Sequence, residues 1–442
     1  MFSRIVLVFA VTGLGQILSI AALKLLARDS TAEQLRHIAD VDVMIQFVIG
    51  IIAFGLQSAA IRNIALRDDW RAEVREVQKA RVALSGFLMF GSVLALWDWK
   101  YILFLAAPLL AVNADYALYG RGHSVAGGLI AFFRTLVPFL FCFIALAVNS
   151  GELYLWYVAG ALVTYALTNV VIHLFLGTPL FHLPAISSIK YYLGSIPLGI
   201  VTLNFYFLGL GILLLAGFFI DDAAIAISFL GLKLYVIYKG ALRVFHQAFV
   251  REMQDDTFCL LMDRCSTLFG LLFFSAVAFF PHSFIGLFFG ERFAMDAALF
   301  IWLAAAAVVY SLFLSMTTQS LLRHRDMSYM WINLIGFTFS VVTFLVAALF
   351  FEGWRPIAMG LLAGELTIAL GLATQFLSFG QIGTRLRFFF ISALVLLVPV
   401  VGRVFFPDSL LSLSVSLFVM MFIFFLINFN TLVRAIAQQK IK

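Results

Sequence analysis

Two basic side chains stand in the middle of long apolar stretches of this 442-residue chain. Arg134 lies within the stretch 124–148, and Lys233 lies within the stretch 223–248. A charged side chain at the centre of a bilayer costs about 2.5–3.5 kcal/mol on insertion scales, so such residues normally face a bundle interior or a wet cavity. Both cations are therefore predicted either to line a cavity or to form structural pairs with carboxylates. Lys24, near the outer end of the first apolar stretch, either reaches the same cavity or snorkels to the interface.

Two carboxylates lie in comparable positions, and they suggest coupling to an ion. Glu365 is near the centre of the stretch 356–379, and Asp115 follows Asn113 in the stretch 101–118. A carboxyl group surrounded by hydrocarbon can exchange a proton near neutral pH. We therefore predict both as sites for coupling to H+ or Na+, with a salt bridge to Arg134 or Lys233 as the alternative.

The uncharged polar candidates for the cavity are Gln16, Gln57 and Asn204, for which hydrogen bonding between helices is the alternative interpretation. No zinc-protease H-E-x-x-H, no nucleophile G-x-S-x-G and no Gly-rich phosphate loop occurs in a credible context. We accordingly predict no catalytic residues, no metal ligands, no cofactor and no enzymatic activity.

The elements that must position these side chains are transmembrane helices. Hydrophobic residues make up 63% of the chain and charged residues only 12%, whereas a soluble domain has about 25% charged residues. A bilayer-spanning helix needs about 20 apolar residues. Apolar stretches of suitable length fall at 5–27, 41–64, 82–97, 101–118, 124–148, 153–176, 191–218, 223–248, 264–289, 295–321, 330–351, 356–379, 386–406 and 410–433. The sequence therefore predicts an all-α integral membrane protein of about fourteen helices, joined by short loops.

The distribution of Lys and Arg predicts the orientation of these helices. With the N-terminus inside, the cytoplasmic segments collect roughly three times as many bases as the outer ones, a strong positive-inside signal. Both termini are then cytoplasmic in a multi-pass protein of the bacterial cytoplasmic (inner) membrane. The sequence pI of about 9.2 reflects this asymmetry, so we expect no nucleic-acid partner. The basic run 67–81 is interpreted as a solvated cytoplasmic loop, with contact to anionic headgroups as the alternative.

A weak internal repeat suggests how the helices are grouped. A shift of the chain by 181 residues places Asp40 on Asp221, Gly50 on Gly231, Ala60 on Ala241 and Arg62 on Arg243. It would superpose the second helix on the eighth, with the same orientation. We predict two parallel-related six-helix bundles, residues 1–176 and 177–379, around a central cavity, as in many transporters. Residues 380–442 would add two helices and a cytoplasmic tail.

Three stretches carry a family resemblance. The second predicted helix ends in Gly55-Leu56-Gln57-Ser58-Ala59-Ala60-Ile61-Arg62, and the segment 287–297 contains Phe289-Gly290 followed by Phe293 and Ala297. The first outer loop, Thr31-Ala32-Glu33-Gln34-Leu35, is similar to the acidic turn of the family but continues with Arg36 where Gly is usual. Over roughly residues 1–380 the chain resembles the polysaccharide-transporter branch, with its Wzx-type O-antigen flippases, of the multidrug/oligosaccharidyl-lipid/polysaccharide exporter superfamily.

The resemblance implies a flippase. Its substrate would be an undecaprenyl-pyrophosphate-linked oligosaccharide, a repeat unit of O-antigen, capsule or exopolysaccharide, carried from the inner to the outer leaflet by alternating access. Arg134, Lys233 and Lys24 would then contact the anionic pyrophosphate. The partners expected are this lipid-linked glycan, membrane lipids and other proteins of polysaccharide assembly.

Other functions remain open. An ion-coupled multidrug antiporter and a peptidoglycan-precursor flippase belong to the same superfamily. A drug antiporter for cations would favour acidic cavity residues, whereas the intramembrane bases here are at least as numerous as the acids. A membrane glycosyltransferase or polymerase is a more remote alternative, because such enzymes usually carry a large outer loop with catalytic carboxylates.

Overall fold

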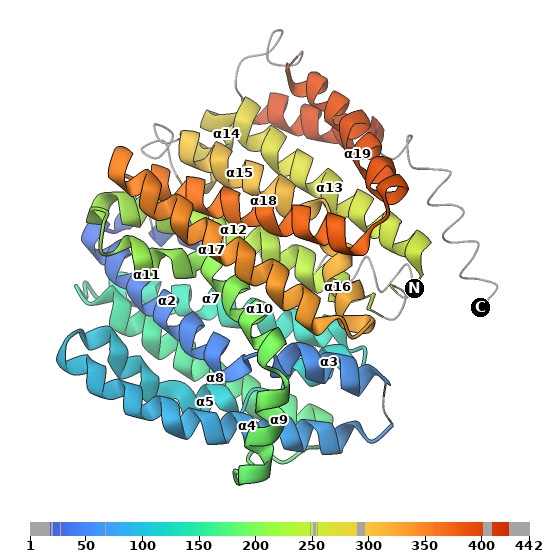
Figure 1. Ribbon diagram of the computed structural model, residues 1–442. Coiled ribbons are helices and arrows are strands. Elements are labelled where there is room, and N and C mark those ends of the chain that lie inside the picture. The colour runs from blue at the N-terminus through green and yellow to red at the C-terminus, as the bar shows by residue number, and fades with distance from the viewer. Residues whose placement is uncertain are drawn as a thin grey trace. The chain divides into compact units, whose positions relative to one another are not determined.

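A computed structural model describes residues 18, 21–26, 28–66, 68–247, 249–250, 253, 255–289, 297–400 and 409–423. Within these ranges every regular element is a helix, as the composition predicts (Figure 1). Ten helices are long and apolar enough to cross a membrane, and two further pairs of helices pass the same test as bent spans. The predicted first and last helices lie partly outside the described residues. The all-α membrane fold with about fourteen helices is therefore confirmed.

The helices follow one another in the order of the predicted stretches. They are α2 (Ala32–Ala53), α3 (Leu56–Leu66), α4 (Trp70–Met89), η1 (Phe90–Leu96), η2 (Trp99–Ala106), α5 (Ala107–Ala111), α6 (Asp115–Gly120), α7 (Ser124–Ala147), α8 (Leu153–Leu176), α9 (Ile186–Gly194), α10 (Ile196–Tyr206), η3 (Phe207–Gly211), α11 (Ile212–Ala216), α12 (Asp222–Gln247), α13 (Asp256–Phe279), α14 (Pro281–Phe288), α15 (Ala297–Ser311), α16 (Leu314–Leu322), α17 (Asp326–Phe350), α18 (Arg355–Phe376), α19 (Phe379–Ala393) and η6 (Leu394–Leu396).

The chain divides into two compact units. One comprises Met1–Phe229 with Arg325–Leu334, and the other comprises Leu230–His324 with Ile335–Lys442. In the first unit α7 packs along α8, and α4 packs against α5 and α9. In the second unit α13, α15 and α18 lie side by side, and α19 packs on α13 (Figure 1). Each unit thus has its own helical core. The division at residues 176 and 379, and the central cavity between the bundles, stay predictions.

The basic run predicted as a loop at 65–81 is helical from Trp70 onward, so that interpretation was wrong. Asp69 caps this helix by accepting a hydrogen bond from the backbone N–H of Ala72 at 3.4 Å. Val74 and Val77 are buried on one face, while Arg71 and Arg75 are exposed on the other. The charges lowered the local hydropathy below that of a membrane helix, although the spacing of the buried residues is that of an amphipathic helix.

Two membrane spans are bent where one helix gives way to the next. The α2–α3 pair bends by 52° and the α15–α16 pair by 40°. At the first bend Gly55 has φ +77°, and α10 approaches so closely that a Cβ added to Gly55 would lie 2.4 Å from the backbone N of Gly199. Only glycine combines this backbone conformation with such a close approach.

We expect Gly55→Ala to lower the thermal stability of the purified protein. The new methyl group would strain the left-handed backbone and collide with the backbone of α10, together costing on the order of 1–3 kcal/mol. The matched control is Gly86→Ala on α4, where an added Cβ meets nothing within 4 Å. Thermal unfolding in detergent, followed by Trp fluorescence, measures both. Equal stability of the two variants would contradict the packing at this bend.

Candidate functional site

The polar centre of the first unit forms around a break in a membrane span. The span Trp99–Gly120 is interrupted after α5, and α6 resumes at Asp115. In lipid, backbone groups released by such a break need partners within the protein. Side chains of α4 and α8 supply them: Asn169 Nδ2 donates to Leu109 O at 2.8 Å, His173 Nε2 to Val112 O at 2.9 Å, and Arg81 Nη1 to Asn113 O at 2.8 Å.

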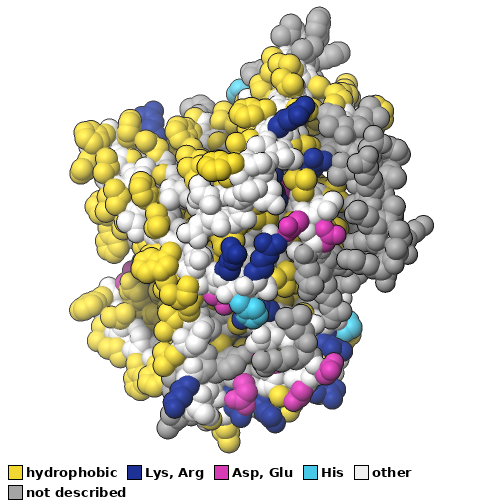
Figure 2. All heavy atoms as spheres, turned by 45° about the vertical axis from the view of Figure 1, so that its right-hand side comes forward, with side chains coloured by type: hydrophobic (Ala, Val, Ile, Leu, Met, Phe, Trp, Pro, Cys, Tyr) yellow, Lys and Arg dark blue, Asp and Glu magenta, His cyan; other side chains and the backbone are white. Residues whose placement is uncertain are grey.

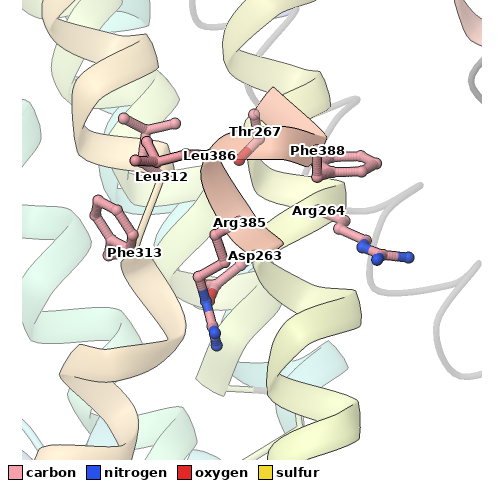
Figure 3. A pocket seen from close by; sticks show the side chains of 8 residues that line it. All are labelled: Asp263, Arg264, Thr267, Leu312, Phe313, Arg385, Leu386 and Phe388. Carbon is pink, nitrogen blue, oxygen red and sulfur yellow. The ribbon is translucent and has the colours of Figure 1, made fainter. Parts of the chain in front are cut away.

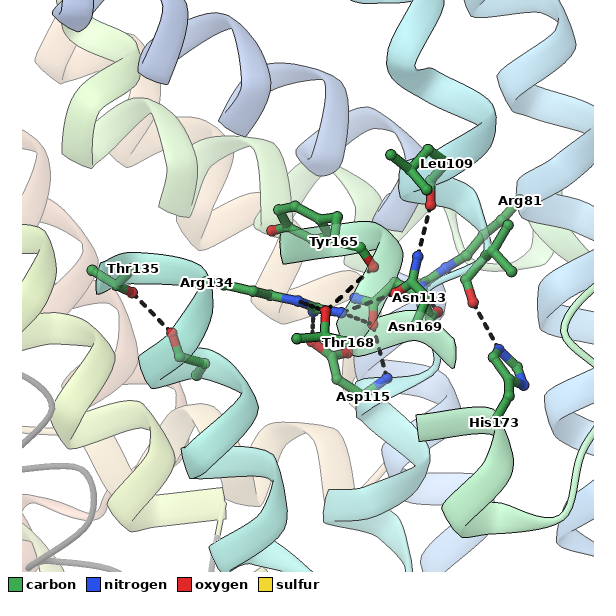
Figure 4. Close-up of polar contacts among 12 residues, drawn as sticks. Arg81, Leu109, Asn113, Asp115, Arg134, Thr135, Tyr165, Thr168, Asn169 and His173 are labelled. Carbon is green, nitrogen blue, oxygen red and sulfur yellow. Dashed lines mark hydrogen bonds and ion pairs between the residues drawn. The ribbon is translucent and has the colours of Figure 1, made fainter. Parts of the chain in front are cut away.

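Arg134 of α7 enters this centre and contacts the residues that hold the break (Figure 4). Its guanidinium donates four hydrogen bonds, each of 3.0 Å: Nε to Thr168 Oγ1, Nη1 to Asp115 Oδ2, and Nη2 to both Asn113 Oδ1 and Asn169 Oδ1. The Tyr165 ring lies 4.3 Å from the guanidinium carbon, within the range of a cation–π contact. The polar groups around the break therefore hold this cation in one orientation.

The ion pair at this site is asymmetric. The Arg134 side chain is 8% exposed and that of Asp115 is 18% exposed. Asp115 Oδ2 accepts from Arg134, whereas Asp115 Oδ1 is buried and accepts no hydrogen bond from the described residues. Asn113 also links the two arginines, because its side-chain oxygen accepts a hydrogen bond from Arg134 and its backbone carbonyl accepts one from Arg81. Two guanidinium groups therefore meet at Asn113.

In the second unit, Glu365 is the centre of a buried polar cluster. Its Oε1 accepts hydrogen bonds of 2.6 Å from Tyr235 Oη and from Lys239 Nζ, and both charged side chains are 3% exposed. The Lys239 ammonium also lies 4.7 Å from the centre of the Tyr310 ring. Such a pair is expensive to bury and is strongly destabilised if one partner is removed.

A second ion pair in the same unit sits at the α15–α16 break. Asp263 of α13 accepts from the backbone N–H of Ser315, in the first turn of α16, and from Arg385 Nε of α19, each at 2.8 Å. The pair borders a pocket of about 250 Å³, lined by Asp263, Arg264, Thr267, Leu312, Phe313, Arg385, Leu386 and Phe388 (Figure 3). The carboxylate thus caps the restarted helix, whose first turn carries a partial positive charge.

Of the residues predicted from the sequence, the structure brings Arg134 and Asp115 into contact. Glu365 pairs with Lys239, so the suggestion that its partner would be Arg134 or Lys233 was wrong. The reason is helical geometry: Tyr235 and Lys239 are four residues apart on one face of α12, whereas Lys233 lies on a different face. Lys233 is buried within α12, in a different compact unit from Arg134.

The other predicted residues lie apart from these clusters. Asn204 of α10 donates to Asn333 Oδ1 of α17 at 3.1 Å, a hydrogen bond between helices. Gln57 is half-buried in the first turn of α3, directly after the bend, and Lys24 is half-buried. Gln16 lies outside the described residues. The substrate and coupling roles assigned to all these residues stay predictions.

Sequence reasoning missed several buried charges: Arg81, Lys239, Asp263 and Arg385. Asp263 and Arg385 were placed in loops because the apolar stretches were started at residues 264 and 386, whereas α13 begins at Asp256 and α19 at Phe379. Lys239 lies within the predicted stretch 223–248 but was not singled out. Its spacing of four residues from Tyr235 was the available signal, since it puts both side chains on one helical face.

Comparison with known proteins addresses the fold. No protein-family model matches the chain, and no curated protein sequence matches it. Among solved structures, a multidrug resistance MATE family transporter of the MOP superfamily in its inward-facing conformation covers 85% of this chain and 95% of its own, with 13% identity and a TM-score of 0.61. A MATE transporter in complex with MaL6 covers 87% and 97%, with 13% identity and a TM-score of 0.60.

The eukaryotic MATE transporter AtDTX14 is similar to the same degree. The match covers 87% of this chain and 97% of AtDTX14, with 14% identity and a TM-score of 0.58. The chain shares the fold of MATE family transporters. One of these structures belongs to the MOP superfamily, which the sequence was found to resemble, and the polysaccharide branch stays a prediction. The likeness extends over nearly the whole of each MATE chain, so both units belong to the shared fold.

We expect Asn169→Leu to destabilise the first unit. Asn169 is buried and serves both Arg134 and the Leu109 carbonyl, so its loss leaves a buried donor and a buried acceptor without their partner, at a cost of about 1–3 kcal/mol. The control is Thr135→Val, beside Arg134 on α7, because the Thr135 hydroxyl bonds the Ala131 carbonyl of its own helix. Thermal melts in detergent compare the two; an unaltered melt for Asn169→Leu would contradict the network.

The Lys239–Glu365 pair makes a different prediction. Lys239→Met alone should lower the unfolding free energy by about 3–5 kcal/mol, because it leaves a buried carboxylate without its cation. The double variant Lys239→Met/Glu365→Leu should recover most of that loss, since both buried charges are then gone. The unfolding free energies of both variants and of Glu365→Leu, each compared with that of the wild type, complete a double-mutant cycle. Additive losses would show that the two side chains do not interact.

Proposed function

We propose that this protein is a gradient-driven membrane transporter that carries an anionic, lipid-linked oligosaccharide from the inner to the outer leaflet by alternating access. The fold shared with MATE transporters supports the transport step. The observation that carries the choice of an anionic substrate is the oriented guanidinium of Arg134 at the break in the first unit, whose Nη1 meets the partly exposed carboxylate of Asp115.

The geometry around Arg134 suits a phosphate ligand. A guanidinium N–H forms a strong, charge-assisted hydrogen bond with a phosphate oxygen. Thr168, Asn113 and Asn169 hold Nε and Nη2, so the group stays oriented when Asp115 Oδ2 leaves Nη1. A phosphate oxygen of the substrate then takes the place of Asp115 Oδ2 on Nη1. In this proposal Asp115 occupies the anion position of Arg134 while no substrate is bound.

The same exchange supplies a means of coupling to protons. Asp115 leaves Arg134 when substrate binds and returns when the pair re-forms, so it is the coupling candidate of the first unit. In the second unit, Glu365 is the corresponding coupling candidate, with H+ or Na+ as the ion. Export of an anion is also favoured by an inside-negative potential, by about 2.3 kcal/mol per charge per 100 mV.

The remaining predicted residues complete the proposed substrate path. Lys233 and Lys24 would add positive charge, and Gln57, Asn204 and Gln16 would contact the glycan. The substrate would be a repeat unit of O-antigen, capsule or exopolysaccharide on undecaprenyl pyrophosphate. The protein would act in the bacterial inner membrane, with cytoplasmic termini, beside other proteins of polysaccharide assembly.

A second candidate function is ion-coupled multidrug antiport. One of the solved structures that share the fold is a multidrug resistance transporter. Asp115 and Glu365 are among the intramembrane carboxylates of this chain, and such carboxylates suit a carrier of cationic compounds. In that case Arg134 and Lys239 would be structural counter-ions.

Complementation separates the two functions. In a strain that lacks its own O-antigen or capsule flippase, we expect the wild-type protein to restore surface polysaccharide. Arg134→Gln and Asp115→Asn should each reduce it at least tenfold, because one loses the phosphate contact and the other loses proton exchange. Lys233→Ala tests the second cation in the same assay. The amount of each protein in the membrane is measured in parallel.

The matched control is Arg355→Gln, an exposed cation in the first turn of α18. It should leave polysaccharide at the wild-type level. Accumulation of ethidium in an efflux-deficient strain is measured for the same variants. Extrusion of ethidium that depends on Asp115 but not on Arg134, with no polysaccharide restored, would replace the flippase assignment by drug antiport. Full polysaccharide in Arg134→Gln would show that Arg134 does not contact the substrate.

A further inference from the structure

A small surface outside the membrane-spanning core forms where α8 ends and α9 begins. α8 terminates in the left-handed conformation of Gly177, and the residues up to 185 are not helical. Two contacts fix this segment to the helices beneath it: His173 Nδ1 lies 2.8 Å from Thr178 Oγ1, and Gln78 Nε2 donates to the Leu180 carbonyl at 2.9 Å. The segment 177–185 therefore has a fixed position in the fold, against α4.

Large apolar side chains of this segment point outward. Leu180 is 43% exposed, Phe181 is 52% exposed and Leu183 is 77% exposed, although the span α8 has already ended at Leu176. Exposed apolar groups are ordinary where a helix faces lipid tails, but these three follow the end of the span. At that depth they meet the boundary between acyl chains and headgroups.

A basic stripe on α4 lies beside the same segment. Arg71, Arg75 and Lys79 are four residues apart, so they share one face of the helix. Arg71 Nη2 comes so close to the end of α8 that a Cβ added to Gly177 would lie 3.6 Å away. Lys and Arg side chains gather with some acidic ones along the lower edge of the face drawn in Figure 2.

The length of the span formed by α4 and η1 places this stripe at the membrane surface. The span Trp70–Leu96 has 27 residues, which corresponds to about 44 Å at about 1.5 Å per residue in α4 and about 2.0 Å in η1, against about 30 Å of hydrocarbon. The excess brings its first turns to headgroup depth. Trp70 marks this level: the guanidinium groups of Arg71 and Arg121 each lie 5.3 Å from its ring, and Trp is enriched at bilayer interfaces.

The surface is positive despite the acidic residue within it. Glu76 pairs with Lys79 at 2.9 Å and lies 3.8 Å from Arg75, so its charge is already engaged. His182, in the segment 177–185, responds to the excess of cations: burial lowers its pKa, and the charges of Arg75 and Lys79 lower it further, against a smaller opposite effect of Glu76. A positive potential therefore extends from α4 over this segment.

We propose that Arg71, Arg75 and Lys79, with the apolar residues Leu180, Phe181 and Leu183, form a binding surface for the anionic phospholipids of the adjacent leaflet. The cations contact the headgroup phosphates, and the apolar residues enter the acyl-chain boundary. By the positive-inside rule this leaflet is the cytoplasmic one. A soluble acidic partner fits less well, because the apolar side chains lie at the edge of the bilayer. This surface is separate from the site around Arg134.

The test titrates the purified full-length protein with dioctanoyl phosphatidylglycerol, and with dioctanoyl phosphatidylcholine as the neutral lipid. Binding and the shift in melting temperature are both recorded. We expect the wild type to bind the anionic lipid and to be stabilised by it, with the effect weakening as salt rises. Arg71→Gln/Arg75→Gln should weaken binding about 25-fold, on the order of fivefold for each cation removed.

Two control variants make the result decisive. Arg355→Gln removes an exposed cation at the opposite end of the predicted topology and should bind like the wild type. Leu183→Ser should weaken binding of both lipids without changing the salt dependence. Equal affinity of the wild type and the Arg71→Gln/Arg75→Gln variant, or equal affinity for the two lipids, would overturn the proposal. Stabilisation of the wild type by inorganic pyrophosphate to the same extent would show a soluble-phosphate site in place of a lipid surface.

Discussion

A backbone group that leaves its helical hydrogen bond inside a bilayer must find another partner within the protein. At the break between α5 and α6 this requirement places Asn169, His173 and Arg81 on the released carbonyls. Those side chains then create the polar surroundings in which Arg134 can remain charged. The break, the polar side chains of α4 and α8, and the buried guanidinium therefore depend on one another, and none of them would be stable in hydrocarbon alone.

The buried pair Lys239–Glu365 has no comparable structural necessity. It lies on continuous helices, α12 and α18, where no broken backbone needs a partner. A well-packed apolar pair of similar volume would often be as stable as, or more stable than, a buried ion pair. The presence of such a pair is more readily explained by a functional role of the two charges than by a contribution to stability. This reasoning favours a coupling role for Glu365 over a structural one.

Hydropathy predicted which segments form helices far better than it predicted where each helix begins and ends. α8 begins and ends at the residues predicted, because its apolar run stops at Gly177, where the chain turns left-handed. α4 and α13 begin earlier than predicted, because a helix need not stop where the hydrocarbon does and its charged first turns lower the local hydropathy. The same effect hid Asp263. The sequence suggested Asp115 as a partner of Arg134, but Asn169 was beyond sequence reasoning, because it lies on another helix and no spacing along the chain reveals that contact.

The two units solve the problem of a broken span in related ways. In the first unit the fourth predicted helix is broken, and a side chain of the third, α4, caps the break. In the second unit the tenth predicted helix is broken, and a side chain of the ninth, α13, caps the break. These two breaks do not coincide in the predicted repeat, because a shift by 181 residues places Val112 of the first break on residue 293, before α15 begins at Ala297. The charges have opposite sign because the exposed helix ends differ. Arg81 meets a carbonyl released beyond the C-terminal end of α5, whereas Asp263 meets an amide at the N-terminal end of α16, and each charge complements the local dipole. The two breaks thus share a way of satisfying exposed backbone groups, and the charge of each cap depends on the helix end that it meets.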